Sequence, residues 1–327
     1  MTLNGAVGTS DAPAPDAAAV ATPQAAVAPA GAPPRARFKF DNRFLAPILI
    51  TCILVAGHFT YGILESPWKT AAAIAASIAI EMVLGRLIVG KWPHLASAYI
   101  TGISVGILIR SNLLWPYVLC AAIAIVSKYA IRFRGRHLWN PSNLGVSAML
   151  FLAPWAVASL SIQWGNEIWV MLIIWTLGSL IIGRLKRFHI CATYVLAFLT
   201  LGFVRSAVTG HTYLAEIAPV TGPMYQLFVF FMITDPKTTV SSKRGQVLVA
   251  VLVAVAETAI RLLPEYHGLV GLTQRQATHG FALHAPYFAL FVVGPLANLV
   301  ELLVWPPPTR PAGGGFPVVT GPVGATR

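Results

Sequence analysis

The sequence predicts an all-α, polytopic membrane protein with about ten transmembrane helices, and three observations lead to this fold class. Hydrophobic residues make up 56% of the 327 residues, charged residues only 10%, and the mean hydropathy is +0.70. A soluble domain carries about 25% charged residues, because polar groups must cover its surface. The apolar residues also form long runs, and the basic residues gather in alternate connections between those runs. Lipid is therefore the expected solvent for most of the chain.

Two terminal segments, residues 1–34 and 306–327, are predicted to be disordered on either side of a transmembrane domain at residues 35–305. Residues 1–34 contain no Lys or Arg and are mostly Ala, Pro, Gly, Val and Thr. Such a composition cannot bury enough apolar surface to offset the entropy lost on ordering. A basic group then precedes the first apolar run, where it is expected to orient a helix rather than to mark a cleaved signal peptide.

The apolar runs are compared with the ~20 residues that an α-helix needs to cross the hydrocarbon core. In chain order, the predicted spans lie near Phe44–Leu64, Thr70–Val89, Ala96–Ile109, Leu114–Ile131, Leu144–Leu160, Glu167–Ile182, Ile190–Val204, Met224–Thr234, Gln246–Leu263 and Ala282–Trp305. The third and eighth are short. Short or broken helices in membrane proteins occur where the backbone lines a cavity instead of facing lipid. These two spans are therefore the expected place for a ligand.

The basic residues test the number of spans independently of hydropathy. When alternate connections are assigned to the side of the N-terminus, that side holds 18 of the 23 Lys and Arg residues and the other side holds 5. Cytoplasmic connections are enriched in Lys and Arg. The distribution therefore predicts ten spans with both termini in the cytoplasm, and it explains the net charge of +12 without a nucleic-acid partner.

Four charged residues fall within or at the ends of the predicted spans: Glu81, Lys128, Glu257 and Glu301. A charge in this position is costly unless it pairs or faces the interior of a helix bundle. Both a path for protons or cations and a set of structural ion pairs remain open. The chain has no motif of a known hydrolase or nucleotide-binding fold, and its three cysteines are far apart. No catalytic residue and no metal site are predicted.

Three polar segments between the spans are candidates for a binding role. In Lys128–Gly145 a basic cluster precedes Asn140 and Pro141, which suit the cap and the first position of a helix. Phe231–Gln246 has an Asp-Pro pair at the end of a short apolar helix, followed by hydroxyl side chains. In Ser206–Ile217 a glycine between hydroxyl residues allows a ligand to approach the backbone closely. Each segment is also consistent with a plain capped loop.

Together the three segments resemble the RnfD/NqrB family, the ten-helix membrane flavoprotein subunits of the Rnf and Na⁺-pumping NADH:quinone oxidoreductase complexes. The sequence F-M-I-T-D-P at 231–236 is similar to the family's F-[MI]-A-T-D-P. The run from Arg136 to Gly145 is similar to its G-x-N-x-x-N-P-A-x-x-G segment, and Pro286–Glu301 resembles its closing helix. The resemblance covers residues 44–305 in the expected order.

The resemblance implies a flavin-binding subunit that passes electrons within a multi-pass complex of the bacterial inner membrane, with lipid and other subunits as partners. Family members attach FMN through its phosphate to the last Thr of a D-x-x-[ST]-G-A-T motif. Here the motif's place is taken by residues 206–212, so Thr212 would be the attachment residue, next to Thr209 and Gly210. Ser206 replaces the Asp of the motif, and His211 replaces its Ala.

The resemblance also implies an inner pocket that holds FMN, riboflavin or a cation. Its lining would come from Asn140, Thr234, Asp235 and Thr238. However, Ile107–Pro116 and the segment that follows it are more similar to a branch of the family found in enediyne biosynthesis clusters, which has no proven redox role. The alternatives are therefore a non-redox transporter, or an export or tolerance factor, on the same scaffold, and a purely structural subunit.

Overall fold

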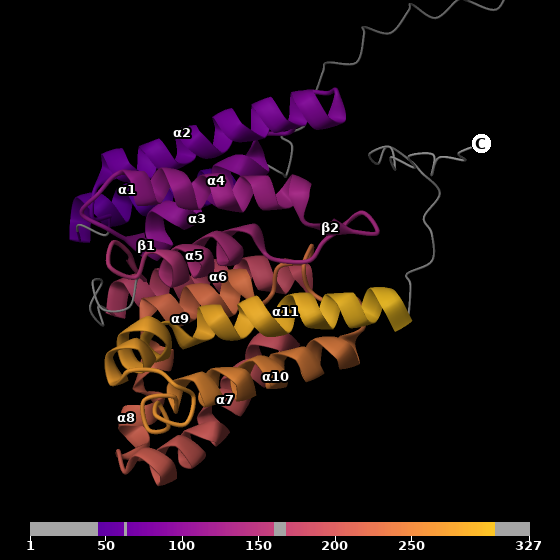
Figure 1. The fold of residues 1–327 in the computed structure, drawn as a ribbon. Coiled ribbons are helices and arrows are strands. Elements are labelled where there is room, and N and C mark those ends of the chain that lie inside the picture. Colours follow the sequence, from indigo (N-terminus) through magenta and orange to yellow (C-terminus); the bar gives the residue numbers. More distant parts are fainter. Residues whose placement is uncertain (1–44, 62–63, 160–167, 305–327) are drawn as a thin grey trace, which may run out of the picture. The chain divides into compact units, whose positions relative to one another are not determined.

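The computed structural model describes residues 45–61, 64–159 and 168–304, and its regular structure is almost entirely helical (Figure 1). The chain divides into two units, Met1–Phe40 and Asp41–Arg327, and all described residues belong to the second. The predicted tails at 1–34 and 306–327 lie outside the described residues.

The α-helices are α1 (Leu45–Tyr61), α2 (Pro67–Leu84), α3 (Ala96–Leu108), α4 (Trp115–Ala130), α5 (Pro141–Leu152), α6 (Ile168–Leu185), α7 (Phe188–Thr209), α8 (Tyr213–Ile217), α9 (Pro223–Leu227), α10 (Lys243–Arg261) and α11 (Ala285–Val304). Three segments of π-helix are η2 (Gly85–Val89), η4 (Phe228–Met232) and η5 (Gln276–Phe281). Two short 3₁₀ helices are η3 (Ala218–Thr221) and η6 (Ala282–His284). Each of the ten predicted spans overlaps a helix, so the prediction of helices at these places is confirmed.

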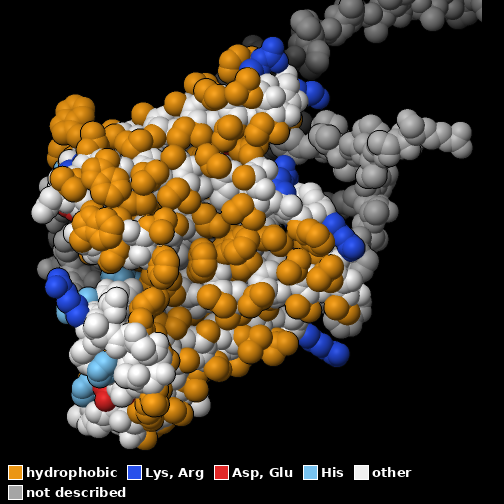
Figure 2. Space-filling view, in the orientation of Figure 1, with side chains coloured by type: hydrophobic (Ala, Val, Ile, Leu, Met, Phe, Trp, Pro, Cys, Tyr) orange, Lys and Arg blue, Asp and Glu red, His pale blue; other side chains and the backbone are white. Residues whose placement is uncertain are grey.

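Within the described residues, three helical segments are long and apolar enough to cross a membrane: Pro67–Val89, Phe188–Thr209 and Gln276–Val304. A fourth candidate consists of two helices, Tyr213–Thr221 and Met224–Met232, bent by 61° at the break between them. Large apolar side chains are exposed along most of the helices. Figure 2 shows that hydrophobic side chains cover much of the visible surface, whereas the Lys and Arg side chains gather mainly toward its edges. The surface of these helices is suited to lipid.

Two pairs of two-residue strands interrupt the helical chain. β1 (Ile109–Arg110) pairs antiparallel with β4 (Ala158–Ser159), and β2 (Arg132–Phe133) pairs antiparallel with β3 (Arg136–His137). The prediction that the fifth span continues to Leu160 is wrong, because α5 ends at Leu152. Pro154 has no backbone N–H and disfavours helical geometry in the residue before it, so the helix ends there.

The third span is short, as predicted, and it packs very closely against α2. A Cβ atom at Gly102 would lie 2.5 Å from the Cα atom of Ile74, and one at Gly106 would lie 2.5 Å from Cγ2 of Thr70. Two small residues four positions apart allow two helix backbones to approach each other within a membrane. Gly102 and Gly106 therefore determine the distance between α2 and α3.

The four charged residues within the predicted spans all have partners of opposite charge. The ion pairs are Lys128 with Glu81 at 3.2 Å, Arg261 with Glu257 at 3.0 Å and Arg136 with Glu301 at 2.9 Å. Lys128, Glu81 and Glu257 are buried. Pairing reduces the cost of a charge in an apolar surrounding. Structural pairing therefore accounts for these residues without requiring an ion path.

Candidate functional site

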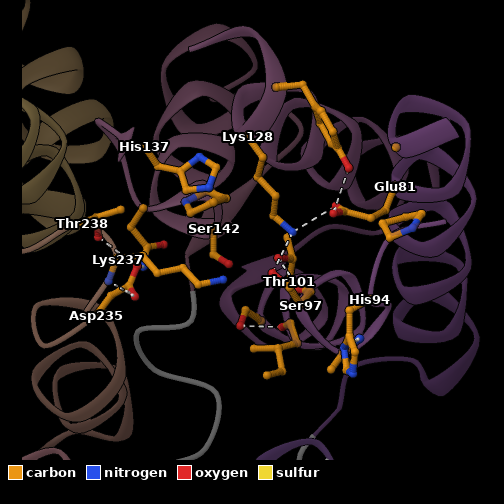
Figure 3. Close-up of a pocket in the computed structure, with 18 of the residues that line it drawn as sticks. Glu81, His94, Ser97, Thr101, Lys128, His137, Ser142, Asp235, Lys237 and Thr238 are labelled. Atoms are coloured by element: carbon orange, nitrogen blue, oxygen red, sulfur yellow. Dashed lines mark hydrogen bonds and ion pairs between the residues drawn. The ribbon is translucent and has the colours of Figure 1, made fainter. Parts of the chain in front are cut away.

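A cavity of about 900 Å³ lies among the end of α2 and η2, one side of α3 along its whole length, the end of α4, the start of α5 and the segment after η4 (Figure 3). Apart from α3, these parts of the chain lie at connections that the sequence assigns to the basic, cytoplasmic side. The two short spans, α3 and the α9–η4 helix, both contribute to its wall. A cavity therefore lies beside both short helices, where the sequence predicts a ligand.

Asp235 organises one wall of this cavity. Its carboxylate accepts hydrogen bonds from the amide of Asn140 at 3.1 Å, the hydroxyl of Thr238 at 2.8 Å and the backbone N–H of Lys237 at 3.1 Å. Asn140 also caps α5, because its side-chain oxygen accepts the N–H of Asn143 at 3.0 Å. The structure thus brings together three of the four residues predicted for an inner pocket.

Thr234, the fourth predicted residue, does not line the cavity. It is buried, and its hydroxyl donates to the carbonyl oxygen of Phe230 at 2.6 Å. A threonine hydroxyl that donates to a carbonyl oxygen in the preceding turn of its own helix needs no other hydrogen-bond partner. The alternation of residues along this turn therefore directs Asp235 and Thr238 toward the cavity and Thr234 away from it.

The opposite wall contains a buried ion pair. The ammonium group of Lys128 donates to Glu81 at 3.2 Å and to the hydroxyl of Ser97 at 3.1 Å, and the hydroxyl of Tyr129 donates to Glu81 at 3.0 Å. Figure 3 shows these contacts between α2, α3 and α4. Tyr129 and Lys128 therefore hold the carboxylate of Glu81 in a fixed position at the edge of the cavity.

The walls carry more positive than negative charge. The cations are Lys91, Lys128, Arg132 and Lys237, and the anions are Glu81 and Asp235. With neutral histidines, the lining has an excess of two positive charges. Charge of one sign in a cleft with low-dielectric walls attracts ligands of the opposite sign. The cavity is therefore suited to an anionic ligand.

Burial and the positive charge of the cavity walls both act on His137. Burial, together with the neighbouring charges of Arg132, Lys237 and Lys128, lowers the pKa of His137 from 6.5 to about 4. The ring is therefore neutral at pH 7. Among the described residues, its Nδ1 atom is buried and has no hydrogen-bond partner. A buried polar atom without a partner is costly, and a bound ligand or water would remove that cost.

The hairpin that carries His137 is anchored to α11. Its turn uses Arg134 and Gly135, both with positive φ, of 48° and 78°. Arg134 donates to the carbonyl oxygen of Leu302, and Arg136 pairs with Glu301. These contacts keep the hairpin in place as one side of the cavity.

Thr212, the predicted site of covalent FMN attachment, lies far from the cavity. It is exposed at the start of α8, and the turn before it contains Gly210 with φ of 72°. Thr209 is held inside this turn, with its hydroxyl 2.9 Å from the carbonyl oxygen of Arg205 and 3.1 Å from Glu216. The segment follows the C-terminal end of α7.

The two predicted flavin positions lie at opposite ends of α7. At its other end, Arg187 donates to the carbonyl oxygen of Thr234, next to Asp235. A helix of 22 residues is about 33 Å long. The structure therefore separates Thr209, Gly210 and Thr212 from the cavity by about the length of one membrane-spanning helix.

Several residues that line the cavity were not predicted from the sequence, although some of them follow a recognisable pattern. Ser97, Thr101 and Ser104 all line the cavity from α3. Their spacing of four and three residues places three hydroxyl groups on one face of an otherwise apolar helix. His137, Ser142 and Lys237 had no comparable signal, because their roles depend on how the connections fold.

Models of known protein families and curated protein sequences gave no match to this chain. Within the described ranges, no group of three His, Cys, Asp or Glu side chains is placed to hold a metal ion. The description of the site therefore depends on its own geometry: a large cavity with hydroxyl and amide groups, two carboxylates and an excess of positive charge.

Proposed function

We propose that this chain is a flavin-binding membrane subunit of an RnfD/NqrB-like electron-transport complex, with the flavin in the cavity of Figure 3. The observation that supports this most is the hydrogen bond between Asn140 and Asp235, which lie 95 positions apart in the chain and meet in the cavity wall. Cofactor sites are concave, and a few well-placed polar groups orient the ligand in them. The volume of about 900 Å³ is within the usual range for such sites.

The residues present fit a flavin such as FMN or riboflavin. Asn140, Asp235 and Thr238 would hold its polar edge, and the buried Nδ1 of His137 would gain a hydrogen-bond partner. When bound, a flavin supplies the electron-accepting chemistry, and the protein supplies binding, orientation and electrostatics. The hydrogen bonds around Asp235 prearrange these side chains, so little side-chain ordering remains when the ligand binds.

Thr212 is proposed as the anchor of a second, covalently attached FMN. Its exposed hydroxyl is accessible to a flavin-transferring enzyme. Ser206, in place of the expected Asp, donates to the carbonyl oxygen of His211 at 2.7 Å and so stabilises the turn before Thr212. Electrons would then pass between one end of α7 and the other, in contact with further subunits of the complex.

The proposed topology has ten spans in the bacterial inner membrane, with both termini in the cytoplasm. The overlap of each predicted span with a described helix supports it, together with the basic connections that alternate along the chain. Single cysteines placed in the connections, in a variant without Cys52, Cys120 and Cys191, would be labelled by an impermeant thiol reagent in whole cells. Labelling at the connection after α7 but not at the hairpin near Gly135 is the expected pattern.

The flavin proposal is tested by purifying the protein in detergent, recording its absorption spectrum and viewing a denaturing gel under ultraviolet light. A yellow protein with a fluorescent band is expected, and the band should disappear in Thr212→Ala while flavin extractable with acid remains. A colourless protein with no extractable flavin would contradict the proposal. The alternative, a non-redox transporter or export factor, is favoured in that case, because the positive cavity would also accept an anionic solute.

A further inference from the structure

Lys128 and Lys237 point into the same part of the cavity from different elements (Figure 3). Lys128 comes from the end of α4, and Lys237 from the segment after η4. The hydrogen bonds of Lys128 to Glu81 and Ser97 use two of the three N–H donors of its ammonium group. Among the described residues, the ammonium of Lys237 has no hydrogen bond or ion pair. Both side chains therefore have donors to offer to a ligand.

The carboxylates of the cavity both accept hydrogen bonds from within the protein. Glu81 accepts hydrogen bonds from Lys128 and Tyr129, and Asp235 accepts from Asn140, Thr238 and a backbone N–H. The cavity lining has more cations than carboxylates, and Lys237 is exposed at its edge. A cleft lined mainly by charge of one sign attracts ligands of the opposite sign. An anionic group of the ligand would therefore be attracted to these walls.

Two neutral groups complete the same region. Ser142 lies at the second position of α5 and faces the cavity, beside His137 with its unpartnered Nδ1 atom. The N-terminus of a helix also favours negative charge. Ammonium groups, a hydroxyl and an imidazole, gathered at the start of a helix, form the kind of donor set that binds phosphate groups.

We propose that this end of the cavity is a phosphate site, in which Lys128 and Lys237 bind a phosphate monoester or diester of the ligand with help from Ser142 and His137. The inference rests on the proposed flavin function and makes it more specific, because it selects FMN over riboflavin, which has no phosphate. The phosphate group of an anionic lipid has the same chemistry and is the other source to be distinguished.

The test compares the binding of FMN and riboflavin to the full-length, delipidated protein in detergent, measured by quenching of flavin fluorescence. A Thr212→Ala background removes the contribution of covalently attached flavin. FMN is expected to bind at least about tenfold more tightly than riboflavin, since hydrogen bonds to a charged group are stronger than those between neutral groups. Lys237→Gln should weaken FMN binding about tenfold and change riboflavin binding less than about twofold. Equal affinities for FMN and riboflavin would overturn the inference.

Lys243→Gln is the matched control, because it removes the same charge from an exposed position at the start of α10, outside the cavity. It should leave the affinities for both flavins unchanged. If Lys237→Gln and Lys243→Gln weaken FMN binding equally, general surface charge explains the effect and the phosphate site is rejected.

A second measurement separates the failure of the phosphate site from the failure of the flavin proposal. Inorganic pyrophosphate is added to the protein, and the midpoint of thermal unfolding is followed. Stabilisation of the wild type and Lys243→Gln, but not of Lys237→Gln, is expected, because a ligand that binds only the folded state raises its stability. If neither flavin binds but pyrophosphate stabilises, only the flavin proposal fails. If pyrophosphate has no effect on the wild type, the phosphate site fails.

The source of the phosphate is identified by extracting the purified protein with chloroform and methanol before delipidation. Bound phosphorus that enters the organic phase, and that FMN displaces, would support the site and assign its natural ligand to a phospholipid. Phosphorus that stays in the aqueous phase with flavin absorbance would support the site with FMN as its ligand.

Discussion

Two regions of the molecule bury charged side chains, and they do so in different ways. At one end of α7, the cavity has four cations and two anions in its walls and a volume of about 900 Å³. Between α7, α8 and α10, a second cluster contains two arginines and two glutamates, Arg205, Arg261, Glu216 and Glu257, and it is filled by their own contacts. The first region has excess positive charge and a large cavity, whereas the second has equal numbers of arginines and glutamates, and the side chains of Arg205 and Glu257 are 0% exposed.

The filled cluster satisfies its charges internally. Arg205, with none of its side chain exposed, donates to Glu216 at 3.2 Å and to the hydroxyl of Thr258 at 3.0 Å, and it stacks on the ring of Phe198 with its guanidinium carbon 4.2 Å from the ring centre. Glu257 accepts hydrogen bonds from Tyr194, Tyr225 and Arg261. A buried polar network with every member satisfied makes its part of the protein rigid and specifies a unique packing.

The comparison shows that burial of charge alone does not mark a binding site in this chain. Both regions contain ion pairs between helices, and both bury a carboxylate that tyrosine hydroxyls hold. They differ in charge balance and in free volume, and only the cavity has both properties that a ligand needs. We therefore assign a structural role to the Arg205–Glu257 region and a binding role to the cavity.

Glu257→Leu is expected to cause the largest loss of stability. It leaves Arg261 and the hydroxyl groups of Tyr194 and Tyr225 without their acceptor in a site where the Glu257 side chain is 0% exposed. Removing one partner of a buried ion pair costs about 3–5 kcal/mol. The free energy of unfolding in detergent micelles should fall by about this amount.

The control for Glu257→Leu is Glu265→Leu, which changes an exposed glutamate shortly after the end of α10. Its free energy of unfolding should stay within about 0.5 kcal/mol of the wild type. If Glu257→Leu were equally mild but abolished flavin binding, the filled cluster would be functional and the comparison would fail.

Glu81→Leu is the same substitution in the other region, and a smaller loss of stability is expected. It removes the partner of Lys128, but the ammonium group keeps its bond to Ser97 and faces a cavity that is large enough for water. The expected loss is about 1–2 kcal/mol. A loss of stability as large as that for Glu257→Leu would show that water does not reach Lys128, so that this wall resembles the filled cluster.

The same variant should improve anion binding. Removal of the Glu81 carboxylate increases the excess positive charge of the cavity, so the affinity for FMN should rise several-fold while riboflavin is little affected. Weaker FMN binding in Glu81→Leu would indicate that Glu81 is needed to position Lys128.

The helices could be predicted from the sequence because lipid imposes a simple requirement. A run of about 20 apolar residues must satisfy its backbone hydrogen bonds internally, so hydropathy and the positions of Lys and Arg indicate where the helices lie. The ends of the helices were harder to predict, because they depend on single residues as well as on hydropathy. Pro154 ends α5 at Leu152 although the sequence there remains apolar, so hydropathy alone does not reveal the end of the helix.

The site was predictable only in part. Asn140, Asp235 and Thr238 were identified because polar residues next to an Asn-Pro or Asp-Pro pair stand out between apolar runs. Thr234 does not line this cavity, and the sequence could not show this, because it does not reveal which way the last turn of a helix faces. The role of His137 depends on a hairpin that is anchored to α11, 165 positions away in the chain at the pair Arg136–Glu301.

His137 provides an effect of a different kind, a change in how stability depends on pH. Its pKa is about 4 in the folded protein and 6.5 in the unfolded chain, because burial and the charges of Arg132, Lys237 and Lys128 disfavour its protonated form. The group is neutral in both states at pH 7. Between pH 6.5 and 4 the unfolded chain binds a proton that the folded protein does not, so stability should fall as the pH is lowered through this window.

His137→Gln should remove this part of the pH dependence, whereas His279→Gln, which changes an exposed histidine of η5, should not. The midpoint of thermal unfolding of each protein, measured between pH 7 and pH 4.5, gives the comparison. Pyrophosphate should reduce the loss in the wild type, because an anion beside His137 favours the protonated ring and raises its pKa. If His137→Gln lost stability with falling pH as steeply as the wild type, His137 would not lie in the positive field of the cavity, and the contrast between the charged cavity and the balanced cluster would be weaker.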